Sequence, residues 1–295
     1  MTKDCIEVSL VISVYGQLEH TKRCLLEIDK TLKGEISYEV LIVDDASKDG
    51  TPKFLRSLDS RYRIFYNETN KGFAKNNNFA AKQAHGKYLC FLNNDVFVQG
   101  NWLLPMLEVF KTYEKVGMVG NVQQLINSRR YDHMGVVFTP QGNPRHYGQG
   151  FFHRPFKGKV KQWSAVTAAC CITVKENFLA IGGFDEVFVN GCEDVDLCLR
   201  MTEKGLDNYV VHDSLVFHVK GASEGRKTFN DKNTQILLDR WQGLIISNQS
   251  VSDQYRHAWT YFYRGIVKPW SINVSKWIEA ILILVRLKKL PSIKS

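Results

Sequence analysis

Two runs of aliphatic residues near the N-terminus constrain the fold more than any other feature. Val8–Val14 and Glu39–Val43 are almost continuously apolar and rich in β-branched residues, which is typical of strands buried on both faces of a sheet. Weaker strand patterns follow at Tyr62–Tyr66 and Lys87–Leu92. This spacing leaves room for helices between the strands, and it predicts an α/β fold with a parallel sheet covered on both faces. The helical segments expected are Leu18–Thr31, Thr51–Leu58 and Ala74–Ala84.

The composition is that of a folded globular protein. Of 295 residues, 44% are hydrophobic and 23% are charged, which excludes a disordered or fibrous chain. The seven cysteines form no Cys-x-x-Cys pair, which argues against a disulfide framework or a zinc knuckle and is typical of a reducing compartment. Acidic residues stand where a signal peptide needs an apolar core, and no apolar stretch approaches the ~20 residues that span a bilayer. We therefore expect a cytoplasmic protein.

The net charge of +9 is concentrated near the C-terminus. Val251–Ser295 has eight Lys and Arg against two acids, so it carries +6, and the rest of the chain is close to neutral. Aromatic residues alternate with the basic ones, and the apolar run Ala280–Val285 is too short to cross a bilayer. The pattern predicts a domain over residues 1–245 and a helical extension over residues 246–295. The extension either contacts the inner face of the cytoplasmic membrane or packs on the domain or on a second subunit of a homodimer.

Polar residues follow the predicted strands at the point where each strand ends. Asp44 and Asp45 come after the second strand, and Asn94 and Asp95 come after the fourth. Ligands of parallel sheets bind beyond these strand ends. A carboxylate of the first pair can accept a hydrogen bond from a base imide or a ribose hydroxyl. Asp95 is either a capping residue or a ligand of a hard divalent cation, which bridges diphosphate oxygens and needs only one or two protein carboxylates.

Three acids begin another predicted helix. A helix dipole stabilises acids in the first turn, and Asp196 can also pair with Arg200 one turn later. Glu193 and Asp194 are better placed to face a pocket, where a carboxylate can take a proton from an attacking hydroxyl. His218 ends a further apolar run and is either a packed strand residue or a metal ligand.

In this order and at this spacing, the segments resemble the family-2 inverting glycosyltransferases of the GT-A fold, in which a Rossmann-like mixed sheet is flanked by helices. The rhamnosyltransferase-like branch, which builds bacterial surface polysaccharides such as O-antigen or capsule, is the most similar. Each motif is weak alone, whereas the ordered set from Val8 to Ser223 is specific. The motifs are Val11-Ile12-Ser13-Val14-Tyr15, Val43-Asp44-Asp45-Ala46-Ser47, Asn70-x-Gly72-Phe73-Ala74-x-x-x-Asn78, Ala84-x-Gly86-Lys87-Tyr88, Leu92-Asn93-Asn94-Asp95, Gly183-Phe184-Asp185-Glu186, Glu193-Asp194-x-Asp196-Leu197-x-x-Arg200 and His218.

The resemblance implies a site for a nucleoside-diphosphate sugar, with UDP- or dTDP-linked donors favoured. The first strand end would flank the base, and a carboxylate after the second strand would bind the base imide. The residues implied to bind the donor are Val14, Tyr15, Asp45, Gly72, Asn78 and Asn94.

The resemblance also implies a metal and a catalytic base. Asp95 stands in the family's Asp-x-Asp motif and would bind a divalent cation together with His218, whose imidazole favours manganese over magnesium. Asn93 replaces the first acid of that motif, which weakens the hold on the metal before the donor arrives. Asp194 would be the catalytic base and Glu193 an acceptor-binding neighbour. The acceptor would be a saccharide, and a lipid-linked one fits the resembled branch.

Three other functions match parts of the pattern. A nucleotidyltransferase needs a Gly-rich, basic triphosphate loop near the first strand, and Val14–Glu19 offers none. A non-catalytic nucleotide-sugar-binding protein would not need Asp95 together with Glu193 and Asp194. Nucleic-acid binding is suggested by the basic, aromatic C-terminal segment, but the near-neutral remainder of the chain argues against it, and we expect no nucleic-acid partner.

Overall fold

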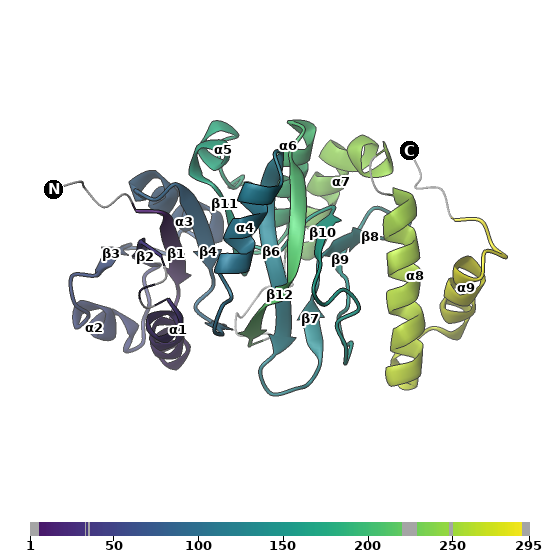
Figure 1. Cartoon of the computed structure of the whole chain (residues 1–295), viewed down its shortest axis with the longest axis horizontal. Coiled ribbons are helices and arrows are strands. Elements are labelled where there is room, and N and C mark those ends of the chain that lie inside the picture. The colour runs from purple at the N-terminus through teal and green to yellow at the C-terminus, as the bar shows by residue number, and fades with distance from the viewer. Residues whose placement is uncertain (1–5, 33, 35, 220–228, 248–249, 291–295) are drawn as a thin grey trace.

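The computed structural model describes residues 6–32, 34, 36–219, 229–247 and 250–290 (Figure 1). Residues 220–223, the end of the region that carries the family resemblance, lie outside this part of the chain. Within it, a central sheet of ten strands runs in the order β10-β12-β6-β11-β4-β1-β2-β3, with β5 paired to β12 and β7 to β6, and β8 and β9 form a separate hairpin. The strands are β1 (Val8–Val14), β2 (Tyr38–Asp44), β3 (Tyr62–Tyr66), β4 (Tyr88–Leu92), β5 (Val96–Val98), β6 (Val116–Leu125), β7 (Tyr131–His133), β8 (Val136–Phe138), β9 (Pro144–His146), β10 (Val160–Trp163), β11 (Cys170–Val174) and β12 (Asp207–His218).

Helices cover both faces of the sheet. Side chains of β1 alternate between the two layers: Leu10 and Ile12 pack in one hydrophobic cluster and Val11 in the other. The first cluster includes residues of α1 (Leu18–Thr31), α2 (Thr51–Arg56) and α4 (Leu104–Thr112). The second includes residues of α3 (Phe73–Gln83), α5 (Lys175–Ala180), α6 (Glu193–Glu203) and α7 (Asn230–Ser247). The predicted α/β architecture with two covered faces is therefore confirmed.

The sheet is mixed, as the family resemblance implied, and the strand pattern alone predicted only its parallel half. β1, β2, β3 and β4 form parallel pairs, but β11 is antiparallel to both β4 and β6. Parallel neighbours need a crossover of a dozen or more residues, usually a helix, and no helix lies between β6 and β11. The segment between β6 and β11 also contains the β8–β9 hairpin. Its second strand, β9, falls within residues 141–161, whose sequence is typical of a long loop.

The C-terminal helices are α8 (Ser250–Val267) and α9 (Val274–Leu284), joined by the short 3-10 helix η1 (Pro269–Ser271). α8 is anchored by Asp253, a residue that is only 1% exposed. Its Oδ2 accepts hydrogen bonds from Ser164 Oγ at 2.6 Å and from the Phe138 amide at 3.0 Å. The Arg256 guanidinium lies 4.2 Å from the centroid of the Trp163 ring. These contacts join α8 to β8 and to the end of β10.

α9 packs on α8 and forms the end of the molecule (Figure 1). Trp277 Nε1 donates a hydrogen bond to the Phe262 carbonyl at 2.9 Å. Gly265 makes this contact possible, because a Cβ at that position would collide with the Trp277 indole. Every helix in the described part of the chain is too short or too polar to cross a membrane.

The anchoring carboxyl makes stability depend on pH. Burial raises the pKa of Asp253 to about 6, against the opposing effects of its hydrogen bonds and of the Arg256 charge. A carboxyl whose pKa is higher in the folded state than in the unfolded state stabilises the fold fully below its unfolded pKa. That contribution is lost as the pH rises through the folded pKa.

We expect the stability of the wild-type protein to fall relative to Asp253→Asn as the pH rises from about 4 to about 7. The difference in the free energy of unfolding should change by up to about 3 kcal/mol, because each pKa unit corresponds to about 1.4 kcal/mol. Urea unfolding of both proteins across this range measures it. A difference that stays constant with pH would contradict the raised pKa.

Candidate functional site

The carboxyl ends of β1, β2, β4 and β12 lie at the same edge of the sheet. β1 is parallel to β2 and β4, and β12 is parallel to β6, which shares the antiparallel neighbour β11 with β4. Side chains predicted to bind ligands follow these strands or end them. The residues that the structure places at this edge are Val14, Tyr15, Asp45, Asn94, Asp95 and His218.

Asp45 organises the loop that faces the end of β1. Its buried carboxylate accepts hydrogen bonds from Asn67 Nδ2 at 2.9 Å and from the amides of Lys71 at 2.7 Å and Gly72 at 3.0 Å. Gly72 has φ 83, a conformation that glycine adopts without strain. The Asp44 carboxylate instead accepts a hydrogen bond from the backbone amide of Ser47, in the turn that follows β2, at 3.2 Å.

The ends of β1, β2 and β4 are tied together next to this loop. The Val14 carbonyl at the end of β1 accepts from the amide of Asp45, which follows β2, at 2.8 Å. Asn94, after β4, donates from Nδ2 to the Gly16 carbonyl at 3.4 Å. Asn94 Nδ2 donates to Thr21 Oγ1 at 3.0 Å, which fixes the residue next to Asp95 against α1. Tyr15 is 56% exposed, so its ring is accessible to a ligand.

His218 lies between two buried carboxylates. Its Nε2 is 3.5 Å from Asp95 Oδ2, and its Nδ1 is 3.5 Å from Asp132 Oδ2 on β7. Burial lowers the pKa of His218, but the neighbouring Asp132 and Asp95 carboxylates outweigh burial and raise it to about 9. Asp132 escaped the sequence analysis because it lies in a three-residue strand that matches no motif.

Asp95 and His218 fit a divalent cation. Asp95 Oδ1 is buried and has no hydrogen-bond partner among the described residues. A carboxylate oxygen and an imidazole nitrogen are both ligands of first-row divalent metals. In the described part of the chain, no three His, Cys, Asp or Glu side chains are grouped as a metal site. A divalent cation needs only one or two protein carboxylates when a bound diphosphate and water supply other ligands.

Asp194 lies next to the strand end that carries Asp95. Its Oδ2 accepts a hydrogen bond from the Ala168 amide at 3.0 Å. The carbonyl of the next residue, Ala169, accepts from the Asn93 amide at 2.9 Å. One short backbone segment thus connects the half-buried Asp194 carboxylate to the candidate metal ligands.

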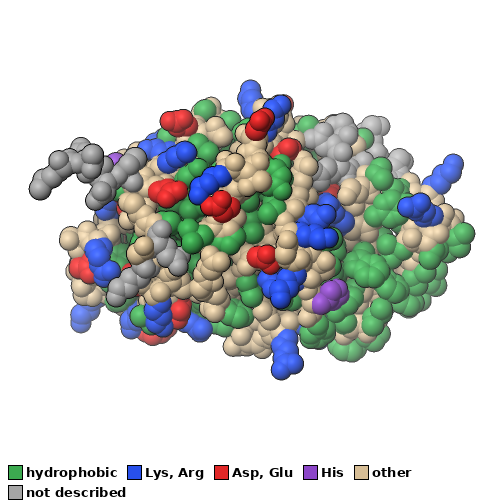
Figure 2. Space-filling view, viewed as in Figure 1, with side chains coloured by type: hydrophobic (Ala, Val, Ile, Leu, Met, Phe, Trp, Pro, Cys, Tyr) green, Lys and Arg blue, Asp and Glu red, His purple; other side chains and the backbone are tan. Residues whose placement is uncertain are grey.

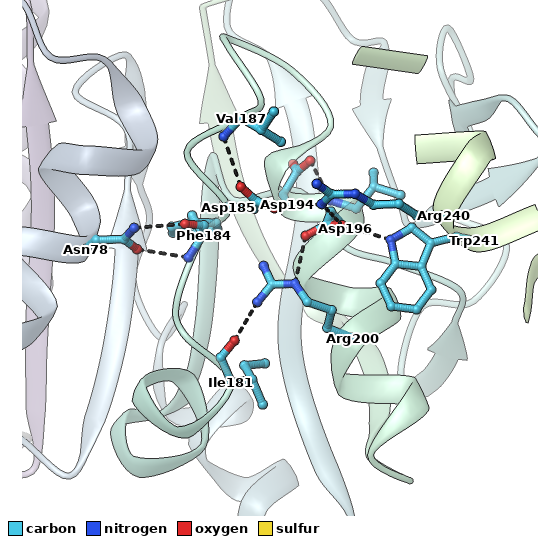
Figure 3. Close-up of polar contacts among 11 residues, drawn as sticks. Asn78, Ile181, Phe184, Asp185, Val187, Asp194, Asp196, Arg200, Arg240 and Trp241 are labelled. Carbon is cyan, nitrogen blue, oxygen red and sulfur yellow. Dashed lines mark hydrogen bonds and ion pairs between the residues drawn. The ribbon is translucent and has the colours of Figure 1, made fainter. Parts of the chain in front are cut away.

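The other two acids at the start of α6 have structural partners. Glu193 is buried, and its Oε2 accepts from the Gly191 amide at 2.6 Å. Asp196 is fully buried and accepts from Arg200 Nε at 2.7 Å and from Trp241 Nε1 on α7 at 2.8 Å (Figure 3). The predicted pairing of Asp196 with Arg200 is therefore confirmed, and it fixes the helix that presents Asp194.

Asn78 uses its amide group to join α3 to the loop before α6. Its Nδ2 donates to the Phe184 carbonyl at 2.8 Å, and its Oδ1 accepts from the Phe184 amide at 2.9 Å (Figure 3). These contacts occupy the groups that would otherwise bind a nucleotide. A donor-binding role for Asn78 stays a prediction.

We expect Asn78→Ala to lower the free energy of unfolding by about 2–4 kcal/mol, because it leaves two buried backbone groups of Phe184 unpaired. Asn77→Ala is the matched control, since Asn77 is buried on the same helix and makes one local hydrogen bond, to the Phe73 carbonyl. Urea unfolding measures stability, and UDP titration of the folded variants measures nucleotide binding. Unchanged stability with loss of UDP binding would assign Asn78 to the donor pocket instead.

Comparisons with known proteins agree on one family. The family model described as Glycosyl transferase family 2 matches residues 9–172. The O-antigen biosynthesis protein RfbC of Myxococcus xanthus is 36% identical over 154 residues, which are 50% of this chain and 12% of the relative. The UDP-Glc:alpha-D-GlcNAc-diphosphoundecaprenol beta-1,3-glucosyltransferase WfgD of Escherichia coli is 32% identical over 136 residues, 45% of this chain and 51% of that protein. The chain thus spans only part of the length of these relatives.

Among solved structures, the crystal structure of GalNAc-T7 with UDP, GalNAc and Mn2+ is similar with a TM-score of 0.66. The match covers 99% of this chain and 56% of that chain at 16% sequence identity. At this identity the likeness establishes the fold alone. The predicted GT-A fold, a mixed sheet flanked by helices and followed by C-terminal helices, is confirmed.

Proposed function

Because the chain belongs to glycosyl transferase family 2, we propose that it is an inverting, metal-dependent transferase that moves a sugar from a nucleoside diphosphate to a saccharide acceptor in surface polysaccharide synthesis. One observation carries the proposal: three different polar groups meet at one sheet edge. They are the Asp45 carboxylate, the pair of Asp95 and His218, and the Asp194 carboxylate. In this order they would bind the nucleobase, hold the cation that contacts the diphosphate, and take the proton from the attacking hydroxyl.

The donor would lie across the ends of β1, β2 and β4. Asp45 is held by three donors from the loop between β3 and α3, so its carboxylate is oriented before a base imide arrives. Val14 and the exposed Tyr15 would flank the base, and Gly72 would shape the loop beside it. UDP- or dTDP-linked sugars are the favoured donors, and the names of WfgD and of the GalNAc-T7 structure contain a UDP-sugar and UDP.

Asp95 and His218 would hold the cation, with Asn94 bracing the loop that carries Asp95. When bound, the cation neutralises the charge that develops on the departing diphosphate. The imidazole ligand favours Mn2+ over Mg2+. Asn93 supplies no charge where the family motif has an acid, so the protein alone would hold the cation weakly.

Asp194 would remove the proton from the acceptor hydroxyl while that oxygen attacks the anomeric carbon. The bond between this carbon and the diphosphate oxygen breaks on the opposite face, so one displacement inverts the configuration and no covalent intermediate is needed. The amides of Ala168 and Val195 donate to the two carboxylate oxygens of Asp194 at 3.0 and 2.9 Å, which fixes the orientation of the group. Glu193, fixed by the Gly191 amide, would help to position the acceptor.

The first test follows nucleoside-diphosphate release from UDP-, dTDP- and GDP-sugars, with membrane lipid extract as acceptor and Mn2+ or Mg2+ present. We expect release from one donor class, its loss in excess chelator, and a fall in turnover by about 10²–10⁴ in Asp194→Asn with little change in donor affinity. The substitution preserves shape and removes only the proton acceptor.

Glu193→Gln is the control, because it neutralises the neighbouring acid of the same turn and should keep more activity than Asp194→Asn. If Glu193→Gln lost more activity than Asp194→Asn, Glu193 would be the catalytic base and Asp194 the acceptor-binding neighbour. Full activity in chelator would exclude metal dependence. Pyrophosphate release from a nucleoside triphosphate would identify a nucleotidyltransferase, and donor binding without transfer would identify a binding protein.

The extension over residues 246–295 would hold the domain over residues 1–245 at the inner face of the cytoplasmic membrane, where a lipid-linked acceptor is confined. Hydrophobic side chains gather over α8 and α9 at one end of the molecule (Figure 2). Trp270 and Leu287 are each 80% exposed, and Ile278 is exposed on α9, in the helical hairpin that α8 and α9 form. Basic residues lie in the same segment of the chain, which suits an anionic lipid surface. They are Arg264, Lys268, Lys276, Arg286, Lys288 and Lys289.

We expect the protein to sediment with vesicles of phosphatidylglycerol and phosphatidylcholine, and salt to weaken this binding without abolishing it. A variant carrying Trp270→Ser, Ile278→Ser and Leu287→Ser should lose most of the binding and keep donor binding. The control carries Leu26→Ser and Leu179→Ser, two exposed apolar residues on α1 and α5.

Equal sedimentation of the triple variant and the wild type would contradict the membrane contact. If the triple variant instead changed from dimer to monomer in gel filtration, the same apolar surface would be the interface of a homodimer.

A further inference from the structure

We infer that Asp132 is a positioning residue: it holds the Nδ1 side of the His218 ring so that Nε2 faces Asp95 and the cation position. The inference rests on the proposed role of His218 as a metal ligand. It adds a residue that belongs to none of the sequence motifs and lies on a different strand from His218.

The two ring nitrogens of His218 face different carboxylates. Nε2 lies 3.5 Å from Asp95 Oδ2 and Nδ1 lies 3.5 Å from Asp132 Oδ2. Because the nitrogens point away from each other, a cation at Nε2 is on the far side of the ring from Asp132. Asp132 is therefore placed to orient the ring and not to complete the ligand set.

Asp132 is itself held in place. It is buried, and its second oxygen, Oδ1, accepts a hydrogen bond from Gln149 Nε2 at 3.2 Å. β7 pairs with β6 in antiparallel register, with His133 opposite Gln123, so the backbone on either side of Asp132 is fixed by the sheet. A buried carboxylate is costly unless it is paired, and Asp132 is buried against an imidazole and an amide.

The chemistry explains why an acid is needed here. A neutral imidazole binds a metal through one nitrogen while the other carries a proton, and a carboxylate on the protonated nitrogen selects this tautomer and stops the ring from turning. Without Asp132 the ring of His218 could present either nitrogen or a carbon to the cation. Loss of such an orienting partner typically lowers metal affinity by about 10- to 100-fold.

The experiment is a double-mutant cycle on Mn2+ affinity, measured by the electron paramagnetic resonance signal of free Mn2+ at saturating UDP. Asp132→Asn should weaken Mn2+ binding by about 10- to 100-fold in the wild-type background and by less than about 2-fold in His218→Ala. The matched control is Asp207→Asn. Asp207 also accepts from a glutamine, Gln162 Nε2 at 2.6 Å, but it lies at the other end of β12 from His218.

Equal loss in both backgrounds would overturn the inference, because it would mean that Asp132 acts on the fold and not through His218. So would unchanged Mn2+ affinity in Asp132→Asn. If His218→Ala itself binds Mn2+ normally, the metal-ligand role fails together with this inference, whereas the Asp194→Asn result still decides the transferase proposal.

A second variant covers the case in which Asp132→Asn does not fold. Gln149 is exposed, so Gln149→Ala removes one partner of Asp132 at the surface. It should weaken Mn2+ binding measurably in the wild-type background and have no effect in His218→Ala. An effect of the same size in both backgrounds, or in neither, would overturn the inference.

Discussion

The burial of both faces of the central sheet is the constraint on which the site depends. Alternate side chains of β1, β2 and β4 enter two separate hydrophobic clusters, so neither face of these strands can carry polar chemistry. Only residues that end the strands or follow them reach a ligand. Because the parallel strands end at one edge, chain segments far apart in sequence deliver Asp45, Asp95 and His218 to the same place.

Three acids near this edge accept hydrogen bonds from backbone amides. Asp45 accepts from the amides of Lys71 and Gly72, Asp194 from that of Ala168, and Glu193 from that of Gly191. Each such bond offsets the cost of desolvating a carboxylate and at the same time fixes a loop. The site is thereby largely oriented by the chain itself, which lowers the reorganisation that ligand binding would require.

The sequence predicted the first four strands and the edge at which the motif residues lie, because both depend on local patterns. It did not predict the contacts that depend on long-range packing. Asn78 and Phe184 are 106 residues apart, and their paired hydrogen bonds leave no local signal. Asp132 lies in a strand of three residues, too short for a periodicity, and its contact with His218 exists only because β7 and β12 both pair with β6.

The attachment of α8 determines what the extension can do for the domain. A flexible tether would only raise the local concentration of acceptor, whereas a docked helix also sets the orientation of the site. Asp253 bonds to Ser164 and to the Phe138 backbone, and Trp277 of α9 bonds to the Phe262 backbone of α8. The apolar surface of α8 and α9 is thus connected to the sheet through buried contacts. In the proposed membrane contact, this connection would hold the sheet edge at a fixed height and angle above the lipid headgroups.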